Sequence, residues 1–337
     1  MFRLLFLVFI IPAISFSTPP PYKGGYGVCP IYHGSSTKSK VITTGTKTVL
    51  FLRVEFSDKK FTKDEAFFNQ LISRFVAYYN EVSYGKLHLV CTLSGTYTLA
   101  GSMTYYGDPE KPSELIANAK VQTTTAGYDH IMVLHAGYGE ETSGKTEDIY
   151  SQTLSDSIIP EIEIYNVSPL GVWCHEFGHQ LGLPDYYLGP PNPYHYFGYW
   201  SLMDVGCYNG NGEYPAHLDG YSKYKLGWIT PEQVENLTLS LKPTSIVYKF
   251  GTGLEFFILE YREKKGFDSS LPGEGFLAYH INEVGTKAVY PADNEWDEFG
   301  DSGDPFPGSS GKREVTFAPG FTFKLIFPAV LSVKAYP

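Results

Sequence analysis

The sequence has little positive charge. Lys and Arg number 26 against 36 Asp and Glu, which gives a formal net charge of −10 at pH 7. Nucleic acids and anionic membrane surfaces are usually bound through clusters of basic side chains. The deficit therefore argues against both as partners.

Charged residues of either sign are also scarce, at 18% of the chain, whereas hydrophobic residues make up 43%. A disordered chain has the opposite balance. A length of 337 residues is enough for one large domain or for two lobes around a cleft. We therefore expect a globular protein with a sizeable core.

Long apolar runs are missing except at the N-terminus, which reads MFRLLFLVFIIPAISFS. The run from Leu4 to Phe16 is shorter than the roughly 20 residues that span a bilayer, and Pro12 interrupts it. A basic residue before it and Ser17 after it are typical of a signal peptide. We predict a signal peptide at residues 1–17 and a secreted, extracellular protein without stable membrane insertion.

The next segments alternate between turn-rich and periodic patterns. Residues 18–46 are rich in Pro, Gly, Ser and Thr and predict an extended arm or short pro-segment. Hydrophobic patterns predict strands at 48–58, 86–99 and 129–139, and an amphipathic helix at 62–80 that begins with a capping box of Thr62 and Glu65.

The strand at 129–139 is well placed to form the upper rim of a cleft, where an extended peptide could pair with it. His130 and His135 flank this strand. We interpret both as ordinary strand-edge histidines, because a fuller set of metal ligands stands elsewhere in the chain.

That set lies in VWCHEFGHQLGLPDYY, residues 172–187. On a helix, residues four apart share a face, so His175 and His179 can direct two imidazole nitrogens to one ion, for which zinc is the best candidate. Glu176 can reach a water on the open side of that ion and act as general base. The motif therefore predicts a metal-activated water.

The end of this helix decides the third ligand. Ser168 and Pro169 predict its start, and Gly182 predicts its end near Leu181. A turn at Gly182 lets the chain double back, so that the Asp185 carboxylate can reach the metal.

Other arrangements of the site stay open. Asp185 could instead orient His179 while Asp219 or Glu213 completes the site. Tyr208 is a candidate donor to the oxyanion.

Segments beyond the helix supply supporting features. Residues 201–206, SLMDVG, would place Met203 in a tight turn beneath the metal, and residues 215–228 predict a short helix. The acidic run at 293–308 is either a calcium site or a solvated loop.

Cysteines are few: Cys29, Cys91, Cys174 and Cys207. In a secreted chain they allow up to two disulfides in three pairings, and a bond between Cys174 and Cys207 would tie the helix to the turn. Alternatively, the thiolate of Cys29 could cap the zinc in a latent precursor.

Several ordered segments resemble the immune inhibitor A family of secreted zinc metallopeptidases, over about residues 48–310. They are VLFLRVEFSD, YYNEVSYGKLHL, YDHIMVLHAG, CHEFGHQLGLPDYY, YWSLMDVG, PAHLDGYSKYKLGW, EFFILEYREKKGFDSSLPGEGFLAYHIN and GDSGDPFPG. The resemblance implies that His175, His179 and Asp185 bind zinc, that Glu176 is the general base, and that calcium sites stabilise the fold.

The expected fold is α+β and zincin- or metzincin-like, with a mixed sheet, an active-site helix and a cleft between two lobes. The core would span residues 47–235, with the upper lobe ending near 183, and a β-rich C-terminal part would span 236–337. The expected function is that of a secreted zinc endopeptidase acting on proteins or peptides. A zinc hydrolase acting on other amides or esters, and a catalytically inactive binding module, are the alternatives.

Overall fold

A computed structural model describes residues 42–163, 168–188, 194–240, 246–297, 299–317 and 321–326. The predicted signal peptide, nearly all of the predicted arm, and Cys29 lie outside these ranges. Within them, no helix is both long enough and apolar enough to cross a membrane.

The N-terminal part is built on one five-stranded sheet. Its strands are β1 (Gly45–Glu55), β2 (Leu87–Thr98), β3 (His130–His135), β4 (Gln152–Leu154) and β5 (Ser157–Ile159). They lie in the order β2-β1-β3-β5-β4, and all neighbours are parallel except β4 and β5. The three longer strands match the strands predicted from the sequence.

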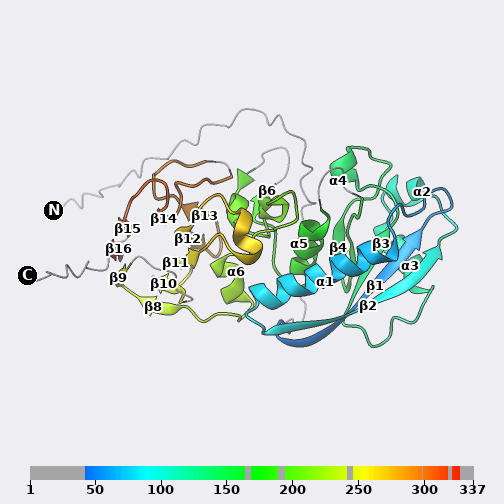
Figure 1. Cartoon of the computed structure of the whole chain (residues 1–337), viewed down its shortest axis with the longest axis horizontal. Helices are drawn as coiled ribbons and strands as arrows, with labels where there is room; N and C mark the ends of the chain where they lie inside the picture. Colours follow the sequence, from blue (N-terminus) through cyan, green and yellow to red (C-terminus); the bar gives the residue numbers. More distant parts are fainter. Residues whose placement is uncertain are drawn as a thin grey trace, which may run out of the picture.

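Some of the helices lie on this sheet, and others lie beyond it toward the C-terminal part (Figure 1). They are α1 (Glu65–Val82), α2 (Met103–Gly107), α3 (Pro112–Lys120), α4 (Glu140–Ser143), α5 (Leu170–Gln180) and α6 (Gly220–Lys225). Alternate residues of β1 point to opposite faces of the sheet. Val49 and Phe51 pack in the core with α1 and α5, whereas Leu50 and Leu52 pack with α2 and α3. The buried run of β1 is thus explained by helices on both faces.

Helix α1 begins later than predicted. Its N-cap is Asp64, whose side chain accepts a hydrogen bond from the backbone N–H of Phe67. Thr62 instead donates its hydroxyl to Glu163, 2.5 Å away. The Thr62 capping box is therefore wrong, because Asp64 takes the N-cap position two residues later.

The prediction that the strand at 129–139 forms the rim of the cleft is also wrong. β3 is an inner strand, because it pairs with β1 along its whole length and with β5 at Ile131 and Met132. The edge strands of the sheet are β2 and the three-residue strand β4, and the sequence did not reveal β4.

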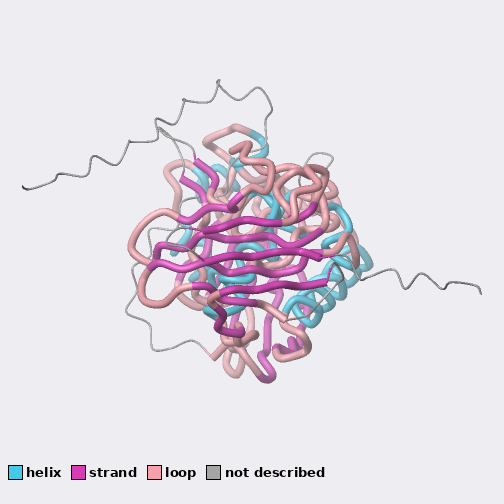
Figure 2. Tube along the Cα trace, turned by 90° about the vertical axis from the view of Figure 1, so that its left-hand side faces the viewer, coloured by secondary structure: helices cyan, strands magenta, loops and turns pink. Residues whose placement is uncertain are grey.

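The C-terminal part contains two further sheets, whose strands run side by side in Figure 2. The six-stranded sheet is formed by β8 (Glu232–Val234), β10 (Tyr248–Phe250), β11 (Glu255–Arg262), β12 (Gly275–Asn282), β13 (Lys287–Tyr290) and β14 (Phe306–Pro307). The smaller sheet contains β9 (Asn236–Ser240), β15 (Glu314–Phe317) and β16 (Phe321–Ile326). The predicted β-rich character of this region is confirmed.

The six-stranded sheet joins the C-terminal part to the core around α5. Phe256 and Ile258 belong to the same buried cluster as α1 and α5, whereas Phe257 and Leu259 pack toward the smaller sheet. The predicted α+β class is confirmed. The zincin-like division into two lobes remains a prediction.

Candidate metal centre

Helix α5 is buried along its whole length, from Leu170 to Gln180. It begins one residue later than predicted, with Pro169 as N-cap and no side-chain cap. Its predicted end is confirmed, because Gly182 has φ +94°, a left-handed conformation that favours glycine. The turn sends the following residues back along the helix.

Both histidines of the motif are oriented by backbone carbonyls. The Nδ1 atom of His175 lies 2.9 Å from the carbonyl oxygen of Leu202, and that of His179 lies 2.9 Å from the carbonyl oxygen of Leu183. A carbonyl only accepts hydrogen bonds, so each Nδ1 carries a proton. In the neutral imidazole, Nε2 is then left with a lone pair.

These two lone pairs face a third acceptor. Oδ1 of Asp185 lies 3.1 Å from Nε2 of His175 and 3.3 Å from Nε2 of His179. All three side chains are at most 6% exposed. Three acceptors at these distances repel one another unless a proton or a metal cation lies among them.

In the metal-free site, the pKa values show that a proton takes this place. Burial lowers the pKa of His175, but the hydrogen bond and the charge of Asp185 raise it to about 10. Burial raises the pKa of Asp185, and the two histidines lower it well below its usual range. Without a metal, a buried imidazolium and a buried carboxylate must therefore share the site, and a cation can replace that proton.

Glu176 stands beside the same atoms. One donor atom each from His175, Glu176 and His179 lie within 4.8 Å of one another, an arrangement that can hold a metal ion. Burial raises the pKa of Glu176, more than the histidines lower it. Its Oε2 lies 2.9 Å from the Thr153 hydroxyl, whereas its Oε1 is buried and makes no hydrogen bond within the described part of the chain. Glu176 and Asp185 are thus two carboxylates with different surroundings at one centre.

Met203 packs beneath the helix, as predicted from the sequence. It is fully buried, and a Cβ atom at Gly178 would lie only 2.4 Å from its sulfur. Glycine is therefore required at position 178 for this approach. The carbonyl of Met203 also accepts a hydrogen bond from Tyr186, which fixes the segment that carries Asp185.

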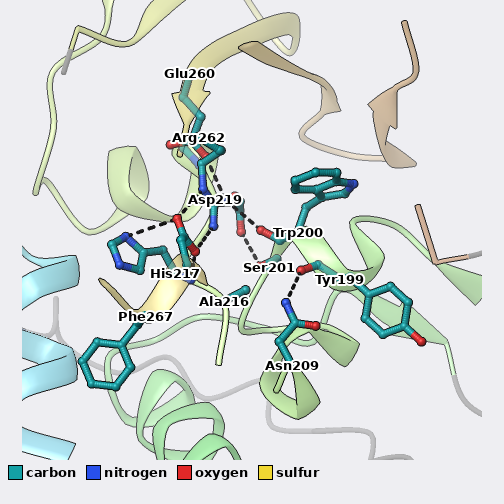
Figure 3. A network of polar contacts seen from close by, with 12 residues as sticks. Tyr199, Trp200, Ser201, Asn209, Ala216, His217, Asp219, Glu260, Arg262 and Phe267 are labelled. Atoms are coloured by element: carbon teal, nitrogen blue, oxygen red, sulfur yellow. Dashed lines mark hydrogen bonds and ion pairs between the residues drawn. The ribbon is translucent and has the colours of Figure 1, made fainter. Parts of the chain in front are cut away.

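The turn that supplies the Leu202 carbonyl is held by a buried charge network (Figure 3). Arg262 donates to the carbonyl of Trp200 at 2.9 Å and to both carboxylate oxygens of Asp268, at 2.8 and 2.6 Å. Glu260 lies 3.2 Å from both Arg262 and Lys223. These four charged residues come from β11, α6 and the segment between β11 and β12, and lie in segments that carry the family resemblance, but the sequence predicted no role for them.

The alternative ligands make other contacts. Asp219 caps α6 through the Ser222 N–H and also accepts from the Ser201 hydroxyl at 2.7 Å, while Glu213 pairs with Arg74. The ring of Tyr208 packs against a small cluster of Val172 and Tyr187.

His130 and His135 lie apart from the centre, in line with a structural role. Nδ1 of His130 lies 3.1 Å from the Gln180 side chain, which joins β3 to α5. Burial lowers the pKa of His135 to about 4, so it is neutral at ordinary pH.

The disulfide prediction is wrong for the described cysteines. Cys91, Cys174 and Cys207 are free thiols. Cys29, with its pairing and its proposed role in latency, lies outside the described residues. Helix α5 and the turn are instead joined by close backbone packing, since a Cβ atom at Gly171 would lie 1.8 Å from the Cys207 carbonyl oxygen.

The acidic run also has a structural role. Asp304 is buried, its carboxylate accepts from the indole N–H of Trp200 at 2.7 Å, and burial raises its pKa to about 7. Among the described residues, the only cluster of three ligating side chains is the one on α5. The calcium reading remains an expectation.

Known proteins match the region of this centre. The family model described as immune inhibitor A peptidase M6, catalytic domain, matches residues 155–229. The pre-pro-metalloprotease PrtV of two strains of Vibrio cholerae serotype O1 is 26% identical over 242 residues, which cover 61% of this chain and 24% of the relative. The chain thus spans about a quarter of the length of these relatives.

A solved structure of OgpA from Akkermansia muciniphila is 12% identical, with a TM-score of 0.36, and the match covers 77% of this chain and 96% of that one. A likeness at this level carries no argument. The resemblance to the immune inhibitor A family, expected from the sequence, is confirmed by the family model and the Vibrio relatives.

Proposed function

We propose that this immune inhibitor A-like protein is a zinc-dependent endopeptidase that hydrolyses peptide bonds of proteins. The observation that supports it best is the meeting of three buried acceptors, from His175, His179 and Asp185, within hydrogen-bond distance. Two imidazoles and one carboxylate are a typical ligand set of catalytic zinc. We assign these three residues as the zinc ligands.

Asp185 is a better third ligand than Glu176. Its Oδ1 lies close to both Nε2 atoms, whereas one oxygen of Glu176 is held by Thr153 on the neighbouring strand. Asp219 and Glu213 are already engaged with α6 and with Arg74. Glu176 is therefore left for proton transfer.

Zinc bound here would polarise the scissile carbonyl and lower the pKa of water toward about 7. Glu176 would take a proton from the attacking water and pass it to the leaving amine. Its unpaired Oε1 is the atom suited to this task, since its raised pKa makes it a stronger base than an exposed carboxylate. The two carbonyls on Nδ1 keep both imidazoles in the tautomer that binds metal.

The substrate would lie along β4. This strand pairs with β5 on one side only, and its residue Thr153 contacts Glu176. An extended peptide that pairs with the free edge would bring a peptide bond next to the general base. We also propose secretion, on the basis of the N-terminal pattern, which detection of the protein in the culture medium would test.

Hydrolysis of a denatured protein, with sequencing of the cleaved ends, tests this function. We expect internal peptide bonds to be cut, a chelator to stop the reaction and zinc to restore it. Glu176→Gln should lower kcat by about 10²- to 10⁴-fold while zinc stays bound.

The same assay separates the alternatives. Cleavage of ester or non-peptide amide substrates without proteolysis would favour another zinc hydrolase. Peptide binding without turnover would favour an inactive binding module.

A further inference from the structure

A side chain outside the zinc-binding motif contacts the general base. Thr153 lies in the middle of β4, is 7% exposed, and points toward α5. Its hydroxyl oxygen lies 2.9 Å from Oε2 of Glu176 and 2.9 Å from the backbone carbonyl oxygen of the same residue. The contact joins the edge strand of the sheet to the active-site helix.

The single proton of this hydroxyl has two possible acceptors. A hydroxyl donates one hydrogen bond at a time, and a carboxylate accepts more strongly than a carbonyl. When Glu176 is ionised, the proton therefore goes to Oε2. The other oxygen, Oε1, then stands alone, since it is buried and has no hydrogen bond within the described residues.

We propose that Thr153 is a positioning residue for the general base: its hydroxyl holds Oε2 of Glu176 and thereby presents Oε1 to the reacting water. This inference rests on the proposed hydrolytic function. A glutamate side chain has three rotatable torsions, so one fixed oxygen removes much of the freedom that would otherwise reduce proton transfer.

The position of Thr153 also links substrate binding to the base. The side chains of Gln152 and Leu154 are half-buried and point away from α5, whereas Thr153 points toward it. A peptide paired with the backbone of β4 would therefore bind to the same three-residue strand that holds Glu176. One short strand would therefore fix the position of the substrate relative to the general base.

Three variants test the proposal. Thr153→Val keeps the shape of the side chain and removes its hydroxyl, and Thr153→Ser keeps the hydroxyl. Ser157→Ala is the matched control, because Ser157 lies on β5 in the same hairpin and its hydroxyl contacts Asp156. Each protein is compared with wild type for zinc content, thermal midpoint, kcat, KM and affinity for a peptide hydroxamate, which ligates zinc and hydrogen-bonds to a neighbouring base.

We expect Thr153→Val to lower kcat and hydroxamate affinity by about 10- to 100-fold, the effect of losing a hydrogen bond to a charged group. KM and zinc content should stay near the wild-type values. Thr153→Ser should restore most of both losses, and Ser157→Ala should leave them unchanged.

Wild-type kcat and hydroxamate affinity in Thr153→Val would overturn the positioning role. So would an equal loss in Thr153→Val and Thr153→Ser, because it would show that packing matters and the hydroxyl does not. If wild-type protein shows neither zinc-dependent hydrolysis nor hydroxamate binding, the proposed function itself fails, and the two failures are thereby distinguished.

Discussion

Two buried polar clusters contact the same turn, one at the carbonyl of Trp200 and the other at that of Leu202, and they differ in how their charges are balanced. Around Arg262, two cations and two carboxylates neutralise one another: Arg262 and Lys223 face Glu260 and Asp268. Around Asp185, the described contacts join one carboxylate to two imidazoles whose Nε2 atoms carry lone pairs. The first cluster is balanced by permanent charges, whereas the second can be balanced either by a proton on His175 or by a metal cation.

The pKa values carry the same contrast. Burial would neutralise Glu260, but Lys223 and Arg262 hold its pKa below the usual range, so all four groups stay charged. Around Asp185, only a proton on His175 supplies the missing charge. Four permanent charges stabilise the turn, whereas a proton on a histidine can be exchanged for a metal cation.

Removal of one partner from the cluster around Arg262 should have the largest effect. Arg262→Met leaves Asp268 and Glu260 without their guanidinium partner, and we expect it to lower the free energy of unfolding by about 3–5 kcal/mol. Urea unfolding measures this change. Lys324→Met is the control, because the pair of Lys324 with Glu314 is half-exposed and should contribute at most about 1 kcal/mol. Equal losses in both variants would remove the distinction.

Removal of the carboxylate from the cluster around Asp185 should instead affect metal binding. We expect Asp185→Ala to weaken zinc binding by at least about 100-fold, because one of three ligands is lost. Competition with a chromophoric chelator measures this affinity. Zinc affinity equal to wild type would show that Asp185 is not a ligand.

The proton on His175 in the metal-free protein should make zinc binding depend on pH. Because the pKa of His175 in the metal-free protein is raised to about 10, zinc must displace a proton below that pH. The apparent Kd for zinc should fall about tenfold per unit between pH 7 and 9.

The stability of the metal-free protein changes in the opposite direction, because it decreases as the pH rises. A raised histidine pKa stabilises the metal-free fold fully below about pH 6.5, and this stabilisation is lost as the pH rises toward 10. Titration of the protein with zinc, followed by calorimetry in buffers of different ionisation heat, would count the protons released when zinc binds. A Kd independent of pH would contradict the presence of a proton in the cluster.

The smallest effect should come from Asp219→Ala. The variant loses the side-chain cap of α6 and the contact with Ser201, and we expect about 1–2 kcal/mol of lost stability. One zinc ion per chain should still bind. If zinc is lost here and retained in Asp185→Ala, the ligand assignment is reversed.

The local part of the site could be predicted from the sequence. His175, Glu176, His179 and the turn at Gly182 depend on helical spacing and on one glycine, so short patterns reveal them. The partners of these residues depend on the order of the strands. Thr153 reaches Glu176 only because a three-residue strand pairs at the sheet edge, and no pattern marks so short a strand.

The errors have the same origin. The hydrophobic pattern identifies the strand at 130–135, but it does not state which strands flank it, so it cannot place the strand at the rim or inside the sheet. The sequence also does not give the distance between Cys174 and Cys207, and both thiols are free. The ion pair of Arg262 and Asp268 could not be predicted either, because the network around it also needs Lys223, which lies far away in the chain.

The proposed metal centre requires that the acceptors of His175, His179 and Asp185 surround a cation. The most direct test is the metal content of the protein after dialysis against micromolar zinc, measured by atomic emission. We predict one zinc ion per wild-type chain and none when His175 and His179 are both replaced by alanine, with the far-ultraviolet circular dichroism unchanged. A folded wild-type protein without zinc, or an equal zinc content in the double variant, would contradict the account.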